Sequence, residues 1–301
     1  MIESMTIAEY AAYQREMGER VVESGGVYWR RVRPFFYRPL VPWQALDPAL
    51  VKPPRAAVLG GWQCVVNDNH PANSRIAFLV FPEARGYSVD SLDKKRRWEV
   101  HTAMKHFEVR AFGHADELKS AYEVYLDFQS RTGYEYRADR VRRESFDAWA
   151  ESVFRHPKVL VLGAFMAGRI EAVSICQVVE DILIYASFFS RGTALAFHVG
   201  SLMLHSARAM AAAAGCIRQV FAGLRKSGRA MSVDDFYLQR GFQVVVEPSY
   251  CRLHPVAGLF LRVLSPGRLE QILGTIWEDG TDVPRPAAAA ARSVAAEILK
   301  S

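Results

Sequence analysis

Hydrophobic and polar positions change their period along the chain, and the clearest changes fall in its second half. Residues 182–190, ILIYASFFS, form an apolar run of the length expected for a buried strand. Residues 199–215 carry apolar side chains at helical spacing, are rich in alanine and end in a glycine suited to a left-handed cap. The strand-like runs IRQVFA and FQVVVEP then flank VDDFYLQRG. This pattern predicts strand, helix, strand, short helix and strand.

The residues before this stretch predict a strand, two helices and a hairpin. FEVRAF, at 107–112, alternates like a strand, and helices with an aromatic stripe begin near Asp116 and Ser145. KVLVLGAFM and RIEAVSICQV flank Ala167 and Gly168, a two-residue turn of the kind that closes a hairpin.

The first third predicts an α plus β block. A helix is expected from about Thr6 to Glu23, followed by short strands in the aromatic, proline-punctuated segment 26–43. AAVLGGWQCVV and RIAFLVF read as two strands, and a helix capped by Asp90 or Ser91 runs to about His106.

Length and composition indicate a globular protein. The 301 residues favour two domains, at about 150 residues per domain. The apolar runs are shorter than the roughly 18 to 20 residues of a membrane helix, and residues 1–23 do not resemble a signal peptide, so a cytoplasmic location without integral membrane segments is expected. The four cysteines are scattered and predict buried free thiols, and no histidine or cysteine spacing suggests a metal site.

The net charge of +6 makes anionic partners plausible, and two basic clusters carry much of it. The first cluster contains Lys94, Lys95, Arg96, Arg97 and Lys105. The second contains Arg131, Arg137, Arg140, Arg142 and Arg143, and Tyr134 and Tyr136 lie within it. Either cluster can be a solvated surface, or can bind a coenzyme phosphate or a tRNA backbone. We select Arg131, Tyr134, Tyr136, Lys95 and Arg96 as candidate substrate contacts.

The order of elements from about Phe107 to Pro255, with FYLQRGF closing the short helix, resembles the core of the GNAT acyltransferase superfamily. The whole chain resembles the Fem-type subgroup, in which two GNAT-like halves form one transferase. The resemblance implies an α/β (α+β) GNAT fold with a mixed, mostly antiparallel sheet flanked by helices. It also implies an N-terminal GNAT-like half at 1–105, a GNAT core at 106–255 and a helical extension at 256–301.

The same resemblance implies a donor site. Acyl-coenzyme A would lie along the end of strand 182–190 and the following helix start, contacting Phe188, Phe189, Ser190, Arg191, His198, Val199, Gly200 and Ser201. A helix start with Gly200 suits an anion, although such a glycine is also often a packing residue. His198 and Leu195 depart from the family's phosphate-binding pattern. Tyr237 matches the tyrosine that protonates the departing thiolate.

The expected reaction is acyl transfer from acyl-coenzyme A to an amine, with Tyr237, Ser187 and Asp181 as catalytic candidates. Asp181, Glu171, His198, Ser187 or a water chain remain open as the general base. Two alternatives also remain open: a Fem-type transferase that uses aminoacyl-tRNA, and a GNAT-like binding module without catalysis. The expected partner is a small amine or aminoacyl acceptor, and tRNA binding and a homodimer stay open.

Overall fold

The protein is described from a computed structural model, which covers residues 2–67, 69–134, 137–225 and 232–264. Two compact units interleave along the chain. The first comprises the described residues of Met1–Gly18, Leu79–Gly223 and Asp235–Val244; the second comprises those of Glu19–Phe78, Leu224–Asp234 and Val245–Ser301. The predicted contiguous parts, 1–105, 106–255 and 256–301, do not follow these boundaries and stay a prediction.

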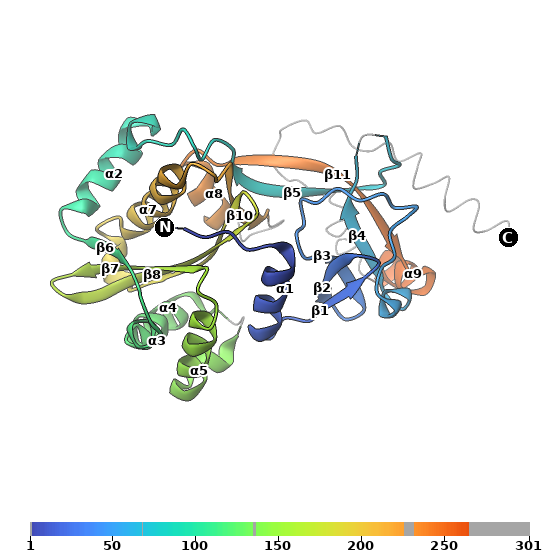
Figure 1. Cartoon of the computed structure of the whole chain (residues 1–301), viewed down its shortest axis with the longest axis horizontal. Helices are drawn as coiled ribbons and strands as arrows, with labels where there is room; N and C mark the ends of the chain where they lie inside the picture. Colours follow the sequence, from blue (N-terminus) through green and yellow to red (C-terminus); the bar gives the residue numbers. More distant parts are fainter. Residues whose placement is uncertain (1, 68, 135–136, 226–231, 265–301) are drawn as a thin grey trace. The chain divides into compact units, whose positions relative to one another are not determined.

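The first unit is built on five strands in the order β10-β9-β8-β7-β6 (Figure 1). Neighbours are antiparallel from β6 to β9, whereas β9 and β10 are parallel. The strands are β6 (Glu108–Ala111), β7 (Val159–Met166), β8 (Arg169–Val179), β9 (Ile182–Ser190) and β10 (Gln219–Leu224). The helices are α1 (Ile7–Glu16), α2 (Lys94–Met104), α3 (Ala115–Lys119), α4 (Tyr122–Thr132), α5 (Arg143–Phe154), α6 (Gly192–Leu195) and α7 (Val199–Ala214). Helix α8 (Ser232–Leu238) belongs to this unit from Asp235 on.

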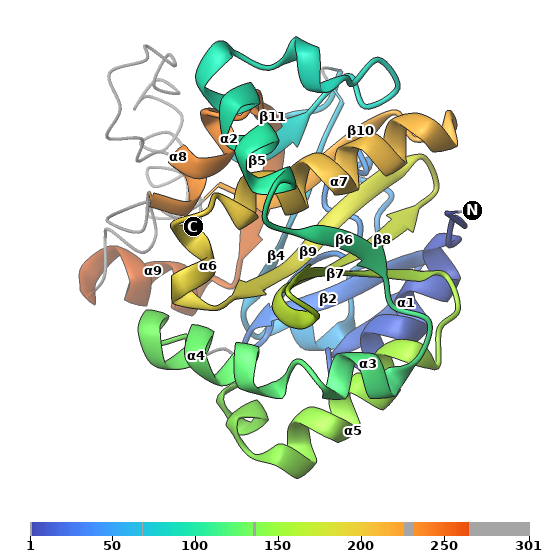
Figure 2. The same cartoon turned by 90° about the vertical axis from the view of Figure 1, so that its left-hand side faces the viewer.

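Helices cover both faces of these strands, with α2 and α7 on one face and α3, α4 and α5 on the other (Figures 1 and 2). Each face has its own apolar core. Val100 of α2 and Met203 of α7 belong to the first core, and Tyr125 of α4 and Phe146 of α5 belong to the second. Burial of these stripes is the main favourable term that holds the layers together.

The second unit contains strands in the order β1-β2-β3-β4-β11-β5. They are β1 (Val21–Ser24), β2 (Val27–Arg33), β3 (Phe36–Pro39), β4 (Gly61–Val65), β11 (Gln243–Leu253) and β5 (Ser74–Phe81), and helix α9 (Pro255–Leu264) follows. Its small core centres on Trp29 and Trp62, whose rings lie edge to face at 6.0 Å. The strands β5 and β11 continue across the boundary between the units.

The predicted fold class is confirmed: the sheet is mixed, mostly antiparallel and flanked by helices. Local signals account for its best-predicted parts. Ala167 and Gly168 have φ of 49° and 77°, as a tight hairpin turn requires, and Gly215 caps α7 at φ 70°.

Several local predictions were wrong. The helix expected to be capped by Asp90 or Ser91 starts at Lys94 and is capped by Asp93, while Val89–Ser91 forms a separate 3-10 helix. The first residues of AAVLGGWQCVV lie in a 3-10 helix, Arg55–Val58, and only Gly61–Val65 is a strand. The first helix ends at Glu16, because Gly18 adopts φ 79° and the chain then enters β1. The helix expected from Asp116 divides into α3 and α4 at Ser120 and Ala121. Cys216 is exposed, whereas Cys64, Cys176 and Cys251 are buried free thiols, as predicted.

Helix α9 lies at the start of the helical extension expected at 256–301, and the rest of that extension, from residue 265 on, lies outside the described residues. Among the described helices, none combines the length and the apolar character needed to cross a bilayer.

Candidate functional site

Strand β9 separates from β10 midway along its length. Among the described residues, the parallel pairing with β10 covers only Ile182 to Ile184. The edge of β9 from Tyr185 onward therefore has no backbone partner among the described residues of β10. On its other side β9 pairs with β8, but Ile175 opposes Ser187 and Cys176 opposes Tyr185. Ala186 is therefore an extra residue, a bulge that bends the strand. The edge therefore leaves peptide groups of β9 without partners on the described part of β10, and a strand edge of this kind can bind an extended ligand.

Tyr237, the candidate proton donor, lies beside this separated edge. Its half-buried ring is 6.3 Å from the ring of Tyr185 and 5.1 Å from that of Phe242. The Tyr185 hydroxyl is 2.6 Å from the Ser174 hydroxyl, and burial raises the pKa of Tyr185 well above its ordinary value. Tyr185 is therefore a neutral hydrogen-bonding group, and it positions the ring of Tyr237 by contact.

The start of α7 is closed by side chains. A Cβ atom at Gly200 would lie 3.4 Å from the Phe236 ring and 3.6 Å from the Phe188 ring, which are ordinary van der Waals distances, so two aromatic rings lie directly against this glycine. Val199 is fully buried, and the amides of Ser201 and Leu202 donate to the carbonyl of His198. Contacts from Val199, Gly200 and Ser201 to a donor phosphate stay a prediction. The side chains packed around the start of α7 do not favour these contacts.

Ser201 belongs to a buried polar network that joins three helices. The Arg240 guanidinium, just after α8, donates to Glu99 Oε2 on α2 at 2.9 Å and to Ser201 Oγ on α7 at 2.8 Å. Ser201 Oγ donates to Glu99 Oε2 at 2.8 Å. Arg96, a candidate substrate contact, pairs with the other oxygen of Glu99 and donates to Gln239 Oε1 at 2.8 Å. These contacts favour a structural role for Arg96 and Ser201.

A second buried cation, Arg208, is hydrogen-bonded to the backbone of Arg240 and extends this network. It donates to the Arg240 carbonyl at 2.7 Å, and its guanidinium lies 4.3 Å from the Tyr87 ring centroid. Burial lowers the pKa of Arg208 to about 10. His205, on the same face of α7, has its Nδ1 2.8 Å from the Tyr87 hydroxyl, and burial, with a smaller contribution from Arg208, lowers the pKa of His205 to about 4.

The predicted donor contacts at the end of β9 do not lie on one face of the strands. Phe188 packs in the core beneath α7, whereas Phe189 is buried on the other face, 5.6 Å from the Tyr125 ring. Ser190 is buried. Arg191 caps α6, and its Nε is 3.9 Å from Oε2 of the buried Glu171.

Asp181 and Ser187, two of the catalytic candidates, are not brought together. Asp181 lies in the turn before β9 and forms a 2.8 Å ion pair with Arg218. Ser187 lies six positions further along the extended strand, which corresponds to about 20 Å. Ser187 is half-buried next to the bulge, and a catalytic role for either residue stays a prediction.

The substrate-contact candidates also divide between the two faces. Arg131, at the end of α4, donates to the Ser190 carbonyl at 3.3 Å, and the exposed Tyr134 packs on Phe128 with ring centroids 5.5 Å apart. Lys95 and Arg96 lie on α2, on the opposite face of the strands (Figure 2). Tyr136 lies outside the described residues.

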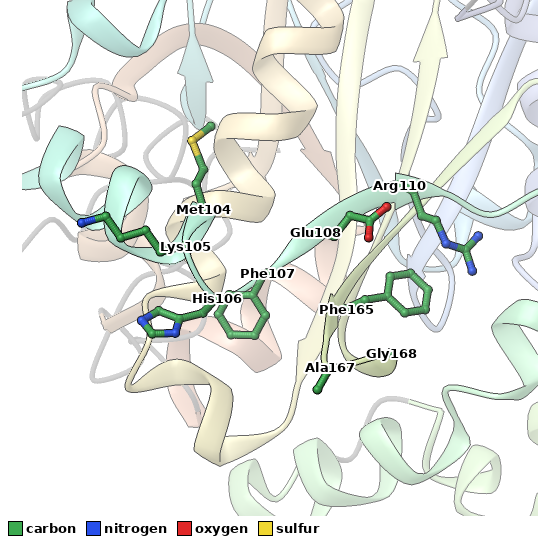
Figure 3. Close-up of a pocket in the computed structure, with 9 residues that line it drawn as sticks. All are labelled: Met104, Lys105, His106, Phe107, Glu108, Arg110, Phe165, Ala167 and Gly168. Atoms are coloured by element: carbon green, nitrogen blue, oxygen red, sulfur yellow. The ribbon is translucent and has the colours of Figure 1, made fainter.

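An open groove of about 600 Å³ lies elsewhere in the first unit, between the end of α2 and the β7–β8 turn. Figure 3 shows Lys105 and His106 on one side and Phe165 with Ala167 and Gly168 on the other. Arg110, on its wall, is paired with Glu117 and stacks on Phe165. Within the described residues, no group of three histidine, cysteine or acidic side chains is placed to hold a metal ion.

Sequence reasoning missed the residues that organise this region: Glu99, Arg240 and Tyr185. One signal was present in α7, where Ser201, His205 and Arg208 recur at helical spacing in an otherwise apolar helix. A polar stripe of that kind is exposed or carries a buried network, and all three residues are buried here.

The three-dimensional arrangement is similar to that of several solved structures. FemX superposes with a TM-score of 0.55 at 8% identity, covering 85% of this chain and 92% of FemX. The C-terminal domain of a protein from Agrobacterium fabrum assigned as a lysylphosphatidylglycerol synthetase gives a TM-score of 0.56 at 12% identity, covering 86% and 91%. A conserved protein of unknown function from Bacteroides thetaiotaomicron gives 0.52 at 9% identity, covering 82% and 90%. No protein-family model and no curated protein matches the sequence. These similarities show that the chain shares the fold of FemX and of the synthetase domain.

Replacing Glu99 by Gln should destabilise the protein strongly, because the Arg240 guanidinium would remain buried without its counter-charge. We expect a loss of about 3 kcal/mol in the free energy of unfolding, measured by urea denaturation. Arg218→Gln, which breaks the exposed pair with Asp181, is the control and should cost less than about 1 kcal/mol. Equal losses of unfolding free energy in the two variants would show that the buried pair stabilises the protein no more than the exposed pair does.

His205 should make stability depend on pH. The folded protein holds His205 neutral down to about pH 4, whereas the unfolded chain binds a proton near the ordinary pKa of 6.5. The contribution is therefore fully present above pH 6.5 and is lost as the pH falls towards 4. Between pH 7 and pH 5 we expect a loss of about 2 kcal/mol from this group.

Urea denaturation of the His205→Gln variant at both pH values tests this, because the variant removes the titrating group. Its stability should fall less between pH 7 and pH 5 than that of the parent protein, whereas the exposed control His114→Gln should retain the parent's slope. An unchanged slope in His205→Gln would contradict the assignment.

Proposed function

We propose that the chain is a cytoplasmic GNAT-type N-acyltransferase that moves an acyl group from acyl-coenzyme A to an amine acceptor. The observation that supports this most directly is the separated edge of β9 beside Tyr185 and Tyr237. An extended pantetheine arm carries amides, and these can pair with the peptide groups that β10 leaves unpaired. The likeness to FemX and the other structures supports the fold on which the proposal rests.

The proposed reaction begins with attack of a neutral amine on the thioester carbonyl. Peptide N–H groups of the β9 edge stabilise the oxyanion, because they are fixed before the charge develops. The tetrahedral intermediate then expels the thiolate of coenzyme A, and the Tyr237 hydroxyl supplies its proton. The attacking nitrogen loses its extra proton to solvent water as the amide forms, and a proton from solvent restores the Tyr237 hydroxyl. Arg131 of α4 donates to the Ser190 carbonyl at the end of β9, and this contact makes it the candidate for holding the acceptor near the edge.

A donor with tRNA in place of coenzyme A is the second candidate, as the Fem-type resemblance implies. The closed start of α7 favours it, because Phe236 and Phe188 cover Gly200 where a coenzyme A pyrophosphate would be expected. If coenzyme A is the donor, its polar contacts come from Arg191 at the start of α6 and His198 at the start of α7.

Tyr237→Phe tests the catalytic proposal. The variant keeps the ring contacts but removes the proton donor, so kcat should fall by about 100-fold or more, with little change in KM. The assay follows thiol release from acetyl-coenzyme A in the presence of a panel of primary amines. Tyr122, on α4, donates its hydroxyl hydrogen bond to the Val141 carbonyl, and Tyr122→Phe is the matched control that should retain full turnover.

Binding experiments separate the donors. Coenzyme A at about 100 times its Kd should stabilise the protein by about 2.7 kcal/mol. Salt-sensitive tRNA retention without an effect of coenzyme A would instead support the Fem-type donor. If neither ligand binds and neither the parent protein nor Tyr237→Phe releases thiol, the chain is a non-catalytic binding module.

A further inference from the structure

One face of α2 is basic, aromatic and exposed. Lys94, Trp98 and Lys105 recur at positions that place them on the same side of the helix, and Lys95 flanks them. The opposite side, with Val100 and Ala103, is buried in the core. Trp98 is 57% exposed, which is unusual for the largest apolar side chain.

This face continues onto the turn before α7. The Trp98 ring lies 5.2 Å from the His198 ring, and the His106 ring lies 4.7 Å from the Phe197 ring. Leu195 and Phe197 of this turn are exposed large apolar residues. We call Lys94, Lys95, Trp98, Lys105, Leu195 and Phe197 the α2 face.

The fold does not use the charges of this face. Among the described residues, Lys94, Lys95 and Lys105 form no ion pair, in contrast to Arg96 and Arg97 on the same helix, which pair with Glu99 and Asp90. Trp98 contacts His198 but stands outside the apolar clusters. Three solvated ammonium groups and three exposed apolar side chains are therefore available to a partner.

We propose that the α2 face docks on the surface of a bilayer that contains anionic phospholipids. The lysines match the phosphate charge of the headgroups, and a tryptophan favours the boundary between headgroups and acyl chains. Leu195 and Phe197 enter that apolar boundary, as the apolar residues of interfacial helices do. A nucleic acid would match the lysines and Trp98 but would leave Leu195 without an apolar environment, so charge and apolar content together favour the bilayer.

The inference goes beyond the proposed reaction and does not depend on it, because docking is measured without turnover. The full chain is sedimented with vesicles of phosphatidylcholine alone and with vesicles that also contain phosphatidylglycerol, at low and moderate salt. Binding is expected to the second vesicles only and should weaken as salt rises.

The combined variant Lys94→Gln, Lys95→Gln and Lys105→Gln should weaken vesicle binding by at least about ten-fold, since each lysine near an anionic surface contributes about five-fold. Trp98→Ala should weaken it as well. The control variant Lys52→Gln, Arg55→Gln and Arg155→Gln removes the same number of charges from other exposed positions and should bind like the parent protein.

Three outcomes would overturn the proposal. The first is no binding to anionic vesicles by the folded protein, and the second is equal binding by the two triple variants. In the second case, loss of binding in Leu259→Glu would place the contact on α9, where Leu259 is exposed. The third is RNA binding that depends on Lys94, Lys95 and Lys105 without any binding to vesicles.

Discussion

The buried ion pair between Arg240 and Glu99 is the interaction on which the arrangement of the first unit depends. Arg240 follows α8, Glu99 lies on α2, and Ser201 of α7 bonds to both. A buried charge whose partner is removed costs several kcal/mol, so the three helices are constrained to one relative position. Tyr237 lies one helical turn before Arg240, and the network therefore also determines where the Tyr237 ring meets β9.

How much of this could be predicted depends on the range of the signals. Strand β9 and helix α7 have the bounds that their apolar patterns predict, and the Ala167–Gly168 turn was predicted from local backbone preference. The Arg240–Glu99 pair joins residues 141 positions apart, and no local pattern identifies such partners. The bulge at Ala186 is equally invisible, because it depends on the register with β8. Asp181 and Ser187 are only six positions apart in sequence, yet the extended strand places them about 20 Å from each other.

Two parts of the candidate site differ in how well they match the resemblance: the edge of β9 with Tyr237 matches it, and the start of α7 does not. The separated edge of β9 and the placement of Tyr237 follow from backbone pairing and ring contacts in one unit. The start of α7, where the resemblance implies phosphate contacts, is instead filled by Phe236, Phe188 and the Ser201 network. A donor held chiefly along the β9 edge satisfies both observations. The basic α2 face lies on the same side of the strands as α7 and adds a surface that the proposed reaction does not require (Figure 2).

Amide hydrogen exchange with and without a non-hydrolysable acyl-coenzyme A analogue tests the central claim most directly, because it reports on the unpaired edge of β9 residue by residue. The account predicts that the analogue slows exchange in Tyr185–Ser190 and in the segment around Tyr237, and that Ile182–Ile184, already paired with β10, changes little. Unchanged exchange along Tyr185–Ser190 at saturating analogue, or protection confined to other strands, would contradict the placement of the donor on β9.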